Sequence, residues 1–309
     1  MKRIWQADGR FWYDLFRLAC HLLTLAIFMS FLGSVLPVGD SLAVFRIEFT
    51  ALLALCGGIA VYLKRSMIPM MAAMTVAVSV ISILPFAGQG ATVQERDFRL
   101  HQHNVLFGNK ELDLLIAKVG QLEADILTFQ EINETNFAHM RAGLEAAFPH
   151  FQVCLYSQGG VAVMMRDLGP LLDYGCVAKG RLAWMRVGTP VGPVTVVSMH
   201  QLWPWPKGQF WQKEVLSRDI AALPRPVLLA GDFNNVPWSA AVRSAAQAAG
   251  GRVARGLGRS YLFDAPWPRF RIDHVVVPIE AEVSAVLTPG WGSDHLGITA
   301  DIRLHRHAD

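Results

Sequence analysis

Side chains that bind metal ions or phosphate follow the ends of several apolar segments after residue 94. Ile126-Leu-Thr-Phe leads to Gln130 and Glu131, and Val227-Leu-Leu-Ala leads to Asp232 and Asn234. One such ending is typical of a cap or a turn, but burying several carboxylates and amides is costly unless they find partners. The pattern therefore predicts one polar cleft at a common edge of the fold. The side chains concerned are Asn104, Glu131, His200, Asp232, Asn234, Asp273, Asp294 and His295.

Short apolar runs alternate with amphipathic stretches throughout this part of the chain, and the spacing distinguishes strands from helices. The expected strands are 98–106, 126–132, 151–156, 160–166, 182–187, 194–200, 226–230, 271–277 and 297–304. The expected helices are 111–122, 137–148, 210–223 and 239–250. Many strands with intervening helices indicate an α/β sandwich in which helices flank two sheets.

A sharp change in composition divides the 309 residues into two parts. Charged residues are rare from Leu18 to Gly88 and reach an ordinary globular density after Gln94. We therefore expect a membrane anchor at 1–93 and a catalytic domain at 94–309, which is long enough to bury a full core. The net charge of +3 gives no global basic field that would indicate nucleic-acid binding.

Three apolar stretches precede the boundary, at 18–38, at 49–63 (or 42–63) and at 67–87. A spanning helix needs about 20 mostly apolar residues, and a signal peptide has only one shorter apolar stretch. Soluble core helices normally carry a polar face, which these stretches lack. The pattern predicts three transmembrane helices with lipid contacts over 18–87. Arg46 and Glu48 must pair or reach the interface if the second stretch spans the bilayer.

Basic residues near the ends of these stretches predict the orientation. Lys and Arg accumulate on the cytoplasmic side of membrane helices, and Lys2, Arg3, Arg10 and Arg17 precede the first stretch, while Lys64 and Arg65 follow the second. If the N-terminus is cytoplasmic, three membrane crossings place residue 94 on the extracytoplasmic side. We expect a multi-pass protein of the inner membrane whose catalytic domain is extracytoplasmic.

Four cysteines do not form a disulfide framework. Cys20 and Cys56 lie in apolar segments and are expected to be small core side chains. Cys154 and Cys176 could pair in an oxidising compartment, and the sequence by itself does not settle whether they do.

The polar blocks, taken in order, resemble the endonuclease/exonuclease/phosphatase superfamily, whose members include deoxyribonuclease I, AP endonucleases and sphingomyelinases. The blocks are Asn104, Gln130-Glu131, Gly231-Asp232-Phe233-Asn234, Arg271-Ile272-Asp273-His274 and Gly292-Ser293-Asp294-His295. The resemblance covers 94–309 and implies a four-layer α/β/β/α sandwich like that of deoxyribonuclease I. With the preceding spans, it looks like a membrane-anchored bacterial branch of that superfamily.

The resemblance implies a divalent-metal site. Glu131 is the expected principal ligand of Mg²⁺, with Mn²⁺ as an alternative ion, because hard cations prefer carboxylate oxygen and retain waters. Asn104 and Asp294 would complete the surroundings of the metal.

The resemblance also implies catalytic roles. Asp232 would orient or deprotonate the attacking water, and Asn234 would hold that water together with a phosphoryl oxygen. His200 and His295 would donate hydrogen bonds to the phosphoryl oxygens or the leaving group, and Asp273 would fix one imidazole. The first block reads Asn104-Val-Leu and lacks the second carboxylate of AP endonucleases, so abasic-site repair is disfavoured.

The substrate class stays open at this point. Trp203 and Trp205 follow His200 and could stack nucleobases, sit at a bilayer interface beside lipid head groups, or only pack their own loop. The favoured activity is phosphodiester hydrolysis of the nuclease type. The alternatives are a phospholipid or phosphomonoester hydrolase at the membrane surface and a catalytically silent binding module. No pattern indicates an oligomeric state.

Overall fold

The structure is a computed structural model that describes residues 2–63, 67–88, 90, 92–156, 159–177, 179, 181–256, 258–262 and 270–305. The chain divides into two compact units. The first comprises Met1–Pro85 with Trp238–Ala240, and the second comprises Phe86–Pro237 with Ala241–Asp309. Lys64 and Arg65, on which the orientation argument partly depends, lie outside the described residues.

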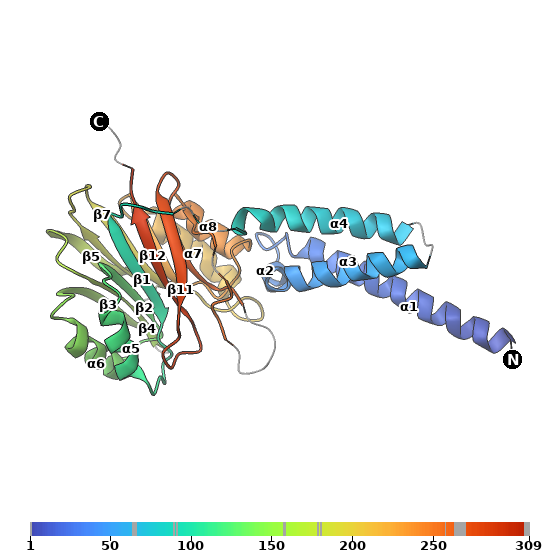
Figure 1. Cartoon of the computed structure of the whole chain (residues 1–309), viewed down its shortest axis with the longest axis horizontal. Coiled ribbons are helices and arrows are strands. Elements are labelled where there is room, and N and C mark those ends of the chain that lie inside the picture. The colour runs from blue at the N-terminus through green and yellow to red at the C-terminus, as the bar shows by residue number, and fades with distance from the viewer. Residues whose placement is uncertain are drawn as a thin grey trace. The chain divides into compact units, whose positions relative to one another are not determined.

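The first unit is helical (Figure 1). Its helices are α1 (Lys2–Met29), α2 (Pro37–Val44), α3 (Arg46–Tyr62) and α4 (Met67–Ile83), followed by the short 3-10 helix η1 (Leu84–Phe86). Two segments, Arg10–Met29 and Met67–Phe86, are long and apolar enough to cross a membrane. The second coincides with the third predicted span, whereas the first begins earlier than predicted and shares only 18–29 with the predicted span 18–38, because α1 ends at Met29.

The second predicted span differs from expectation. Helices α2 and α3 meet at Phe45 with a bend of 68°, so this stretch is a broken pair rather than one continuous helix. Arg46, at the start of α3, is buried and its guanidinium donates to the hydroxyl of Ser30 at 2.8 Å and to that of Ser82 at 3.2 Å. These hydrogen bonds hold the guanidinium inside the helical unit.

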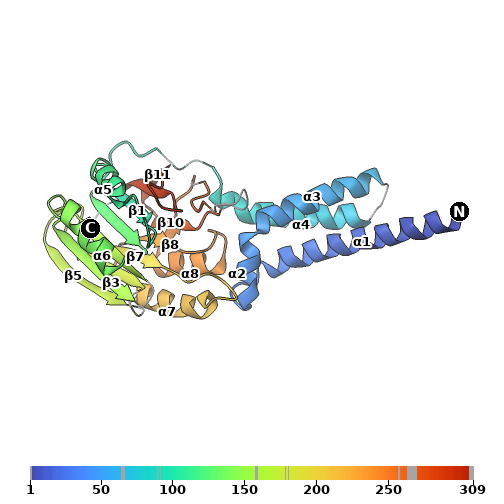
Figure 2. The ribbon, with the colours of Figure 1, turned by 90° about the horizontal axis from the view of Figure 1, so that it is seen from below.

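The second unit contains two six-stranded sheets. The first sheet has the order β11 (Glu282–Thr288), β12 (Gly297–Arg303), β1 (Phe98–Asn104), β2 (Ile126–Gln130), β4 (Gly159–Met165) and β3 (His150–Tyr156). The second has the order β5 (Leu171–Val177), β6 (Leu182–Val187), β7 (Val194–His200), β8 (Val227–Asp232), β10 (Asp273–Pro278) and β9 (Gly251–Val253). Four helices, α5 (Leu112–Gly120), α6 (Glu134–Leu144), α7 (Gln209–Ala221) and α8 (Ala240–Ala248), complete the unit (Figure 2).

Three apolar clusters hold these elements together. One contains side chains of both sheets, among them Leu100, Val163 and Val196. A second joins the second sheet to α7 and α8, and a third joins the first sheet to α5 and α6. Strands β4 and β7 are buried along their whole length. The sequence of β4 is apolar throughout, whereas β7 also buries Thr195, Ser198 and His200. The chain therefore has an α/β fold in which helices pack on two sheets.

Each sheet has one parallel strand pair near its centre. β1 runs parallel to β2 with Asn104 opposite Gln130, and β7 runs parallel to β8 with His200 opposite Asp232. The remaining strand pairs of the two sheets are antiparallel. Because the carboxyl ends of parallel strands lie at the same edge, each pair delivers two polar side chains to one place.

Three strands fall outside the expected set, namely β5, β9 and β11. β5 is an edge strand with a mixed, largely exposed pattern, and β9 has only three residues, so neither carries a clear apolar alternation. Helix α6 begins three residues before the expected start. Asn133 explains this difference, because its side chain accepts the N–H of Asn136 at 2.8 Å and forms a capping box there.

Cys154 and Cys176 form a disulfide, which decides the alternative that the sequence left open. Cys154 lies on β3 and Cys176 on β5, the edge strands of the two different sheets. The bond closes a separation of 22 residues. Cys20 and Cys56 are free.

Candidate active site

The two parallel strand pairs place their terminal side chains against one another. Asn104 ends β1, and its Nδ2 atom donates to Oε1 of Glu131 at 3.0 Å and to Oδ2 of Asp232 at 3.0 Å. Glu131 follows β2 with a left-handed φ of 58°, a conformation that turns the chain sharply at the strand end. The side chain of Glu131 is 27% exposed, whereas Asn104 and Asp232 are buried. The carboxylate of Glu131 thus lies at the mouth of the site.

The second pair contributes an imidazole and a carboxylate. Nε2 of His200 lies 3.6 Å from Oδ2 of Asp232 and 4.0 Å from Oε1 of Glu131. Asn234, also left-handed with a φ of 49°, donates its backbone N–H to Oδ1 of Asp232 at 2.8 Å. Its side-chain nitrogen donates to the carbonyl of Gln201 at 2.8 Å. The Gly231-Asp232-Phe233-Asn234 block therefore holds its own carboxylate in place.

His295 and Asp273 form a buried dyad. Nδ1 of His295 lies 2.8 Å from Oδ2 of Asp273, and its Nε2 lies 3.8 Å from Oδ2 of Asp232. Ser293 fixes the loop, because its hydroxyl donates to the carbonyl of Asn104 at 2.6 Å and accepts the backbone N–H of His295 at 3.0 Å. Asp273 opens β10 directly opposite Asp232.

A buried chain of polar side chains supports this dyad from inside the fold. Nε2 of Gln102 donates to Oδ1 of Asp273 at 3.1 Å and to Oε1 of Gln130 at 2.7 Å. Gln130 in turn donates to the hydroxyl of Ser198 at 2.9 Å, and Ser198 donates to the carbonyl of Phe129 at 3.0 Å. Both glutamines and Ser198 are fully buried. This series of hydrogen bonds runs from the first sheet to the second. It fixes the amide of Gln102 with its nitrogen toward Asp273.

The sequence model of the endonuclease/exonuclease/phosphatase family matches residues 101–295. This range is more than half of the chain and contains every site residue described above. The chain belongs to this family. No curated protein matches the chain in sequence.

Solved structures with this fold resemble the second unit. An endonuclease/exonuclease/phosphatase from Bacteroides vulgatus has 19% identity and a TM-score of 0.56, covering 68% of this chain and 100% of that one. TDP2 of D. rerio, solved with a single-stranded DNA product, has 16% identity and a TM-score of 0.56, covering 67% and 99%. A mutant beta toxin of Staphylococcus aureus with bound magnesium has 11% identity and a TM-score of 0.52, covering 66% and 99%.

These likenesses show a deoxyribonuclease I-like α/β fold. With membership of the family, the chain is a metal-dependent phosphoester hydrolase. The catalytically silent binding module considered for the sequence is therefore set aside.

The pKa values of His200 and His295 are shifted in opposite directions. Burial, with smaller contributions from Arg181 and His295, lowers the pKa of His200 to about 4. Burial acts in the same direction on His295, but the carboxylates of Asp273 and Asp232 outweigh it and raise its pKa to about 10. At neutral pH His200 is uncharged and His295 is an imidazolium.

The carboxyl groups favour an added cation. Burial raises the pKa of Asp232 to about 8, and burial also raises the pKa of Asp294. Oδ1 of Asp294 and Oδ1 of Asn234 are buried without a hydrogen-bond partner among the described residues. Oxygen atoms of this kind, beside a half-exposed Glu131, are the ligand set that hard divalent cations prefer. The residues present therefore fit the metal dependence of the family.

Two clusters in the described part of the chain bring possible ligand atoms within 4.8 Å of one another. One consists of Glu131, His200 and Asp232, and the other of Asp232, Asp273 and His295. The predicted set of Asn104, Glu131 and Asp294 overlaps the first cluster only in Glu131. Asp294 belongs to neither cluster, although it directly precedes His295 in the chain.

Aromatic side chains line one side of the dyad. The ring of Tyr261 lies 4.8 Å from that of His295, and the ring of Trp203 lies 5.7 Å from Tyr261. Trp203 is partly exposed and Trp205 is more exposed. His101 and His103 are buried on β1, with Nδ1 of His101 3.0 Å from the Thr299 hydroxyl and Nε2 of His103 3.1 Å from the Gly290 carbonyl.

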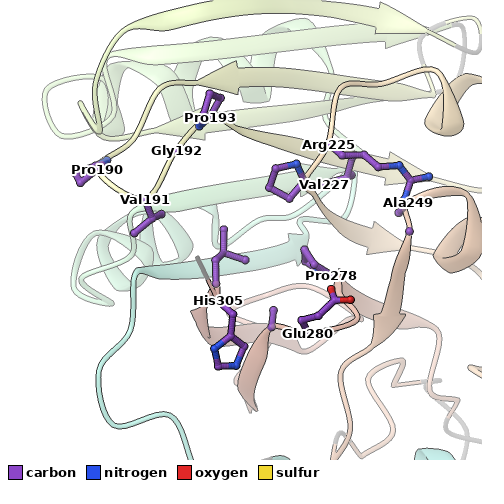
Figure 3. Close-up of a pocket in the computed structure, with 14 residues that line it drawn as sticks. Pro190, Val191, Gly192, Pro193, Arg225, Val227, Ala249, Pro278, Glu280 and His305 are labelled. Atoms are coloured by element: carbon purple, nitrogen blue, oxygen red, sulfur yellow. The ribbon is translucent and has the colours of Figure 1, made fainter. Parts of the chain in front are cut away.

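A cavity of about 710 Å³ lies elsewhere in the same unit. Its walls include Val227, Arg225, Glu280 and His305 (Figure 3). Val227 begins β8 whereas Asp232 ends it, so the cavity is at the opposite end of this strand from the carboxylates. It contains none of the predicted site residues, and we assign it no part in catalysis.

Proposed function

We propose that the protein is a membrane-anchored, divalent-metal-dependent phosphodiesterase of a bacterial branch of the family, with its catalytic domain on the extracytoplasmic side. The observation that carries the proposal is the convergence of Glu131, His200, Asp232 and His295 from four separate segments. The three apolar clusters support a four-layer sandwich, and we assign 1–93 to the anchor and 94–309 to catalysis.

The side chains suit hydrolysis by in-line attack of water on phosphorus. Burial favours the protonated form of Asp232, and a bound cation would favour its ionised form. In the ionised form Asp232 accepts a proton from the attacking water, and Asn234 holds that water beside a phosphoryl oxygen. The imidazolium of His295, oriented by Asp273, protonates the leaving oxygen as its bond to phosphorus breaks. Glu131, as the main ligand, with Asn104 and Asp294 would hold Mg²⁺ or Mn²⁺, which would supply positive charge against the developing negative charge.

The activity is tested on the full-length protein in detergent. With Mg²⁺ it should hydrolyse bis-(p-nitrophenyl) phosphate faster than p-nitrophenyl phosphate, and EDTA should abolish both activities. Glu131→Gln should lower kcat at least about 100-fold, because charge compensation by a metal contributes several kcal/mol. Glu134→Gln is the matched control, since Glu134 is exposed in the first turn of α6. Equal rates for both variants and the unmodified protein would refute the assigned site.

Phospholipid or phosphomonoester hydrolysis is a second candidate. The continuous contact from His295 through Tyr261 to the partly exposed Trp203 supports it, because tryptophan favours bilayer interfaces. Reconstituted protein is compared on phospholipid vesicles, short single-stranded DNA and p-nitrophenyl phosphate. A preference for vesicle lipid that disappears in Trp203→Ser supports the lipid substrate, and a preference for DNA supports the nuclease reading.

The extracytoplasmic location rests on the basic residues before the first span and on the disulfide, because disulfides persist mainly in oxidising compartments. A third span, formed by α2 and α3 together, is part of this topology. The test is a single added thiol at the exposed Asp167 in a Cys20→Ser/Cys56→Ser background. A membrane-impermeant maleimide should label Asp167→Cys in intact cells. Labelling only after lysis would place the domain in the cytoplasm.

A further inference from the structure

Gln209, the first residue of α7, is buried and contacts both of the loops that follow β7 and β8. Its Nε2 atom donates to the carbonyl of Leu202 at 2.6 Å and to that of Phe233 at 2.9 Å. Its Oε1 atom accepts a side-chain N–H of Asn235 at 2.6 Å. Leu202 follows His200 by two positions in the chain. One amide group therefore joins the loop that begins at a catalytic imidazole to the loop that follows the catalytic carboxylate.

The orientation of this amide follows from its partners. Two carbonyl oxygens require the nitrogen of Gln209 on their side, because turning the amide over would place its oxygen against both of them. The side-chain oxygen of Asn235 accepts the backbone N–H of Val236 at 2.9 Å, so the side-chain nitrogen of Asn235 faces Gln209. Both N–H groups and the oxygen of the Gln209 amide thus have partners. A carboxylate could not take its place, since it has no N–H for the two carbonyls.

The two residues that Gln209 holds on the second loop, Phe233 and Asn235, are the chain neighbours of Asn234. Asn234 has a left-handed φ of 49°, a conformation that costs free energy for a residue with a side chain and persists only where the surrounding contacts impose it. The side-chain nitrogen of Asn234 also reaches across to the first loop and donates to the carbonyl of Gln201 at 2.8 Å. Gln209 therefore fixes the backbone on both sides of Asn234 and provides a second link between the same two loops.

We propose that Gln209 is a positioning residue that locks the loop 232–235 against the loop 200–202 and thereby sets the position of the Asn234 amide. Its hydrogen bonds go to the neighbours of Asn234, so its effect on the reaction passes through that residue. Without these bonds the backbone of Asn234 would relax from its left-handed conformation, and its amide would move away from the water and the phosphoryl oxygen. The catalytic consequence rests on the proposed function, whereas the joining of the two loops does not.

Amide hydrogen exchange of the full-length protein in detergent, without added metal, tests the joining of the loops. Gln212 offers a matched control, because its side-chain oxygen accepts the backbone N–H of Leu202 at 2.7 Å and, among the described residues, it has no hydrogen bond to 232–235. Gln209→Met, which keeps the length of the side chain, should speed exchange about 10-fold in peptides that cover 200–206 and 231–237, since buried hydrogen bonds of both loops are lost.

Gln212→Met should speed exchange in 200–206 alone. Unchanged exchange over 231–237 in Gln209→Met, or equal changes in the two variants, would overturn the proposal. Gln209→Asn, whose amide is one methylene too short to reach both loops, should give the same pattern and replaces Gln209→Met if that protein does not fold.

Steady-state kinetics on bis-(p-nitrophenyl) phosphate test the catalytic consequence. Gln209→Met should lower kcat about 10-fold or more and leave KM within about two-fold, because a misplaced water slows the attack without weakening substrate binding. Gln212→Met should lower kcat less. The double variant Gln209→Met/Asn234→Ala should be no slower than Asn234→Ala alone, and additive losses would show that Gln209 does not act through Asn234. If the unmodified protein hydrolyses no phosphoester, the proposed function fails, while the exchange experiment still decides whether Gln209 joins the loops.

Discussion

Nδ1 of His295 lies 2.8 Å from Oδ2 of Asp273, and both side chains are almost completely enclosed. The contact joins the loop before β12 in the first sheet to the start of β10 in the second. Burial alone would raise the pKa of Asp273, but the charge and hydrogen bond of His295 outweigh it and hold that pKa below its usual value. The dyad is therefore ionic at neutral pH, with its proton on the imidazole.

Replacing Asp273 should abolish most of the activity. Asp273→Asn keeps the shape of the side chain but removes the negative charge that stabilises the imidazolium of His295. We expect kcat on bis-(p-nitrophenyl) phosphate to fall about 100-fold or more, the range of a lost acid–base group. Asp167→Asn, at an exposed position, serves as control. Full activity of a folded Asp273→Asn protein would show that His295 needs no carboxylate.

Gln102 should matter for activity although it lies behind the dyad. Gln102→Met keeps the side-chain volume but removes the donor to Asp273 at 3.1 Å and leaves the side-chain oxygen of Gln130 without this partner. An unpaired buried acceptor costs about 1–3 kcal/mol, and the misplaced dyad should lower kcat about 10-fold. Steady-state kinetics and thermal unfolding measure the two effects. Gln247→Met, exposed on α8, should change neither.

Acid should destabilise the catalytic unit through its buried, uncharged histidines. Burial lowers the pKa of His274 to about 3 and that of His103 to about 4. Since the unfolded histidines titrate near pH 6.5, the unfolded state binds more protons below that pH. The contribution of these two histidines to the free energy of unfolding is thus fully present above pH 6.5. It is lost as the pH falls toward 3, by about 1.4 kcal/mol per pH unit for each histidine.

The contribution of His274 to this acid sensitivity can be isolated. Its Nε2 lies 2.8 Å from the Asn235 carbonyl, and its Nδ1 is buried without a partner among the described residues. A proton on Nδ1 would therefore have no acceptor in the fold. Between pH 7 and pH 5, His274→Gln should lose less unfolding free energy than the unmodified protein. His139→Gln, which changes a half-exposed histidine, should behave like the unmodified protein.

The disulfide should stabilise the second unit against unfolding. Closing a loop of 22 residues restricts the unfolded chain by about 3 kcal/mol. The Cys154→Ser/Cys176→Ser protein should therefore unfold at lower denaturant concentration, and dithiothreitol should shift the unmodified protein to match it. Cys56→Ser is the control, because Cys56 is a free thiol. If reductant shifts the double variant as strongly as the unmodified protein, the effect has another source.

The sequence predicted the elements that carry strong patterns. β4 is a continuous apolar run, β7 is a mostly apolar run that ends at His200, and α5 has its apolar residues at helical spacing, so their types and approximate bounds agree with the structure. The exposed edge strand β5 has no such pattern and was missed. Likewise, hydrophobicity alone does not indicate the bend of 68° between α2 and α3 at Phe45.

The site was predictable where a polar residue ends an apolar strand, as Asp232 and His200 do. Gln209 begins a helix and carries an amide, but a glutamine in the first turn of a helix is too common to stand out. Gln102 could not be predicted, because its partner Asp273 lies 171 positions away and on the other sheet. Only the register of both sheets reveals that contact.

The reactive groups are divided between the two sheets. Activity therefore depends on how the sheets are aligned with each other. Asn104 belongs to one sheet and Asp232 to the other, and their side chains are 3.0 Å apart. Sliding one sheet by a single residue would displace its groups by about 3.3 Å, as far as the whole contact. Enlarged or shortened side chains between the sheets, remote from any substrate, should therefore silence the protein while it remains folded.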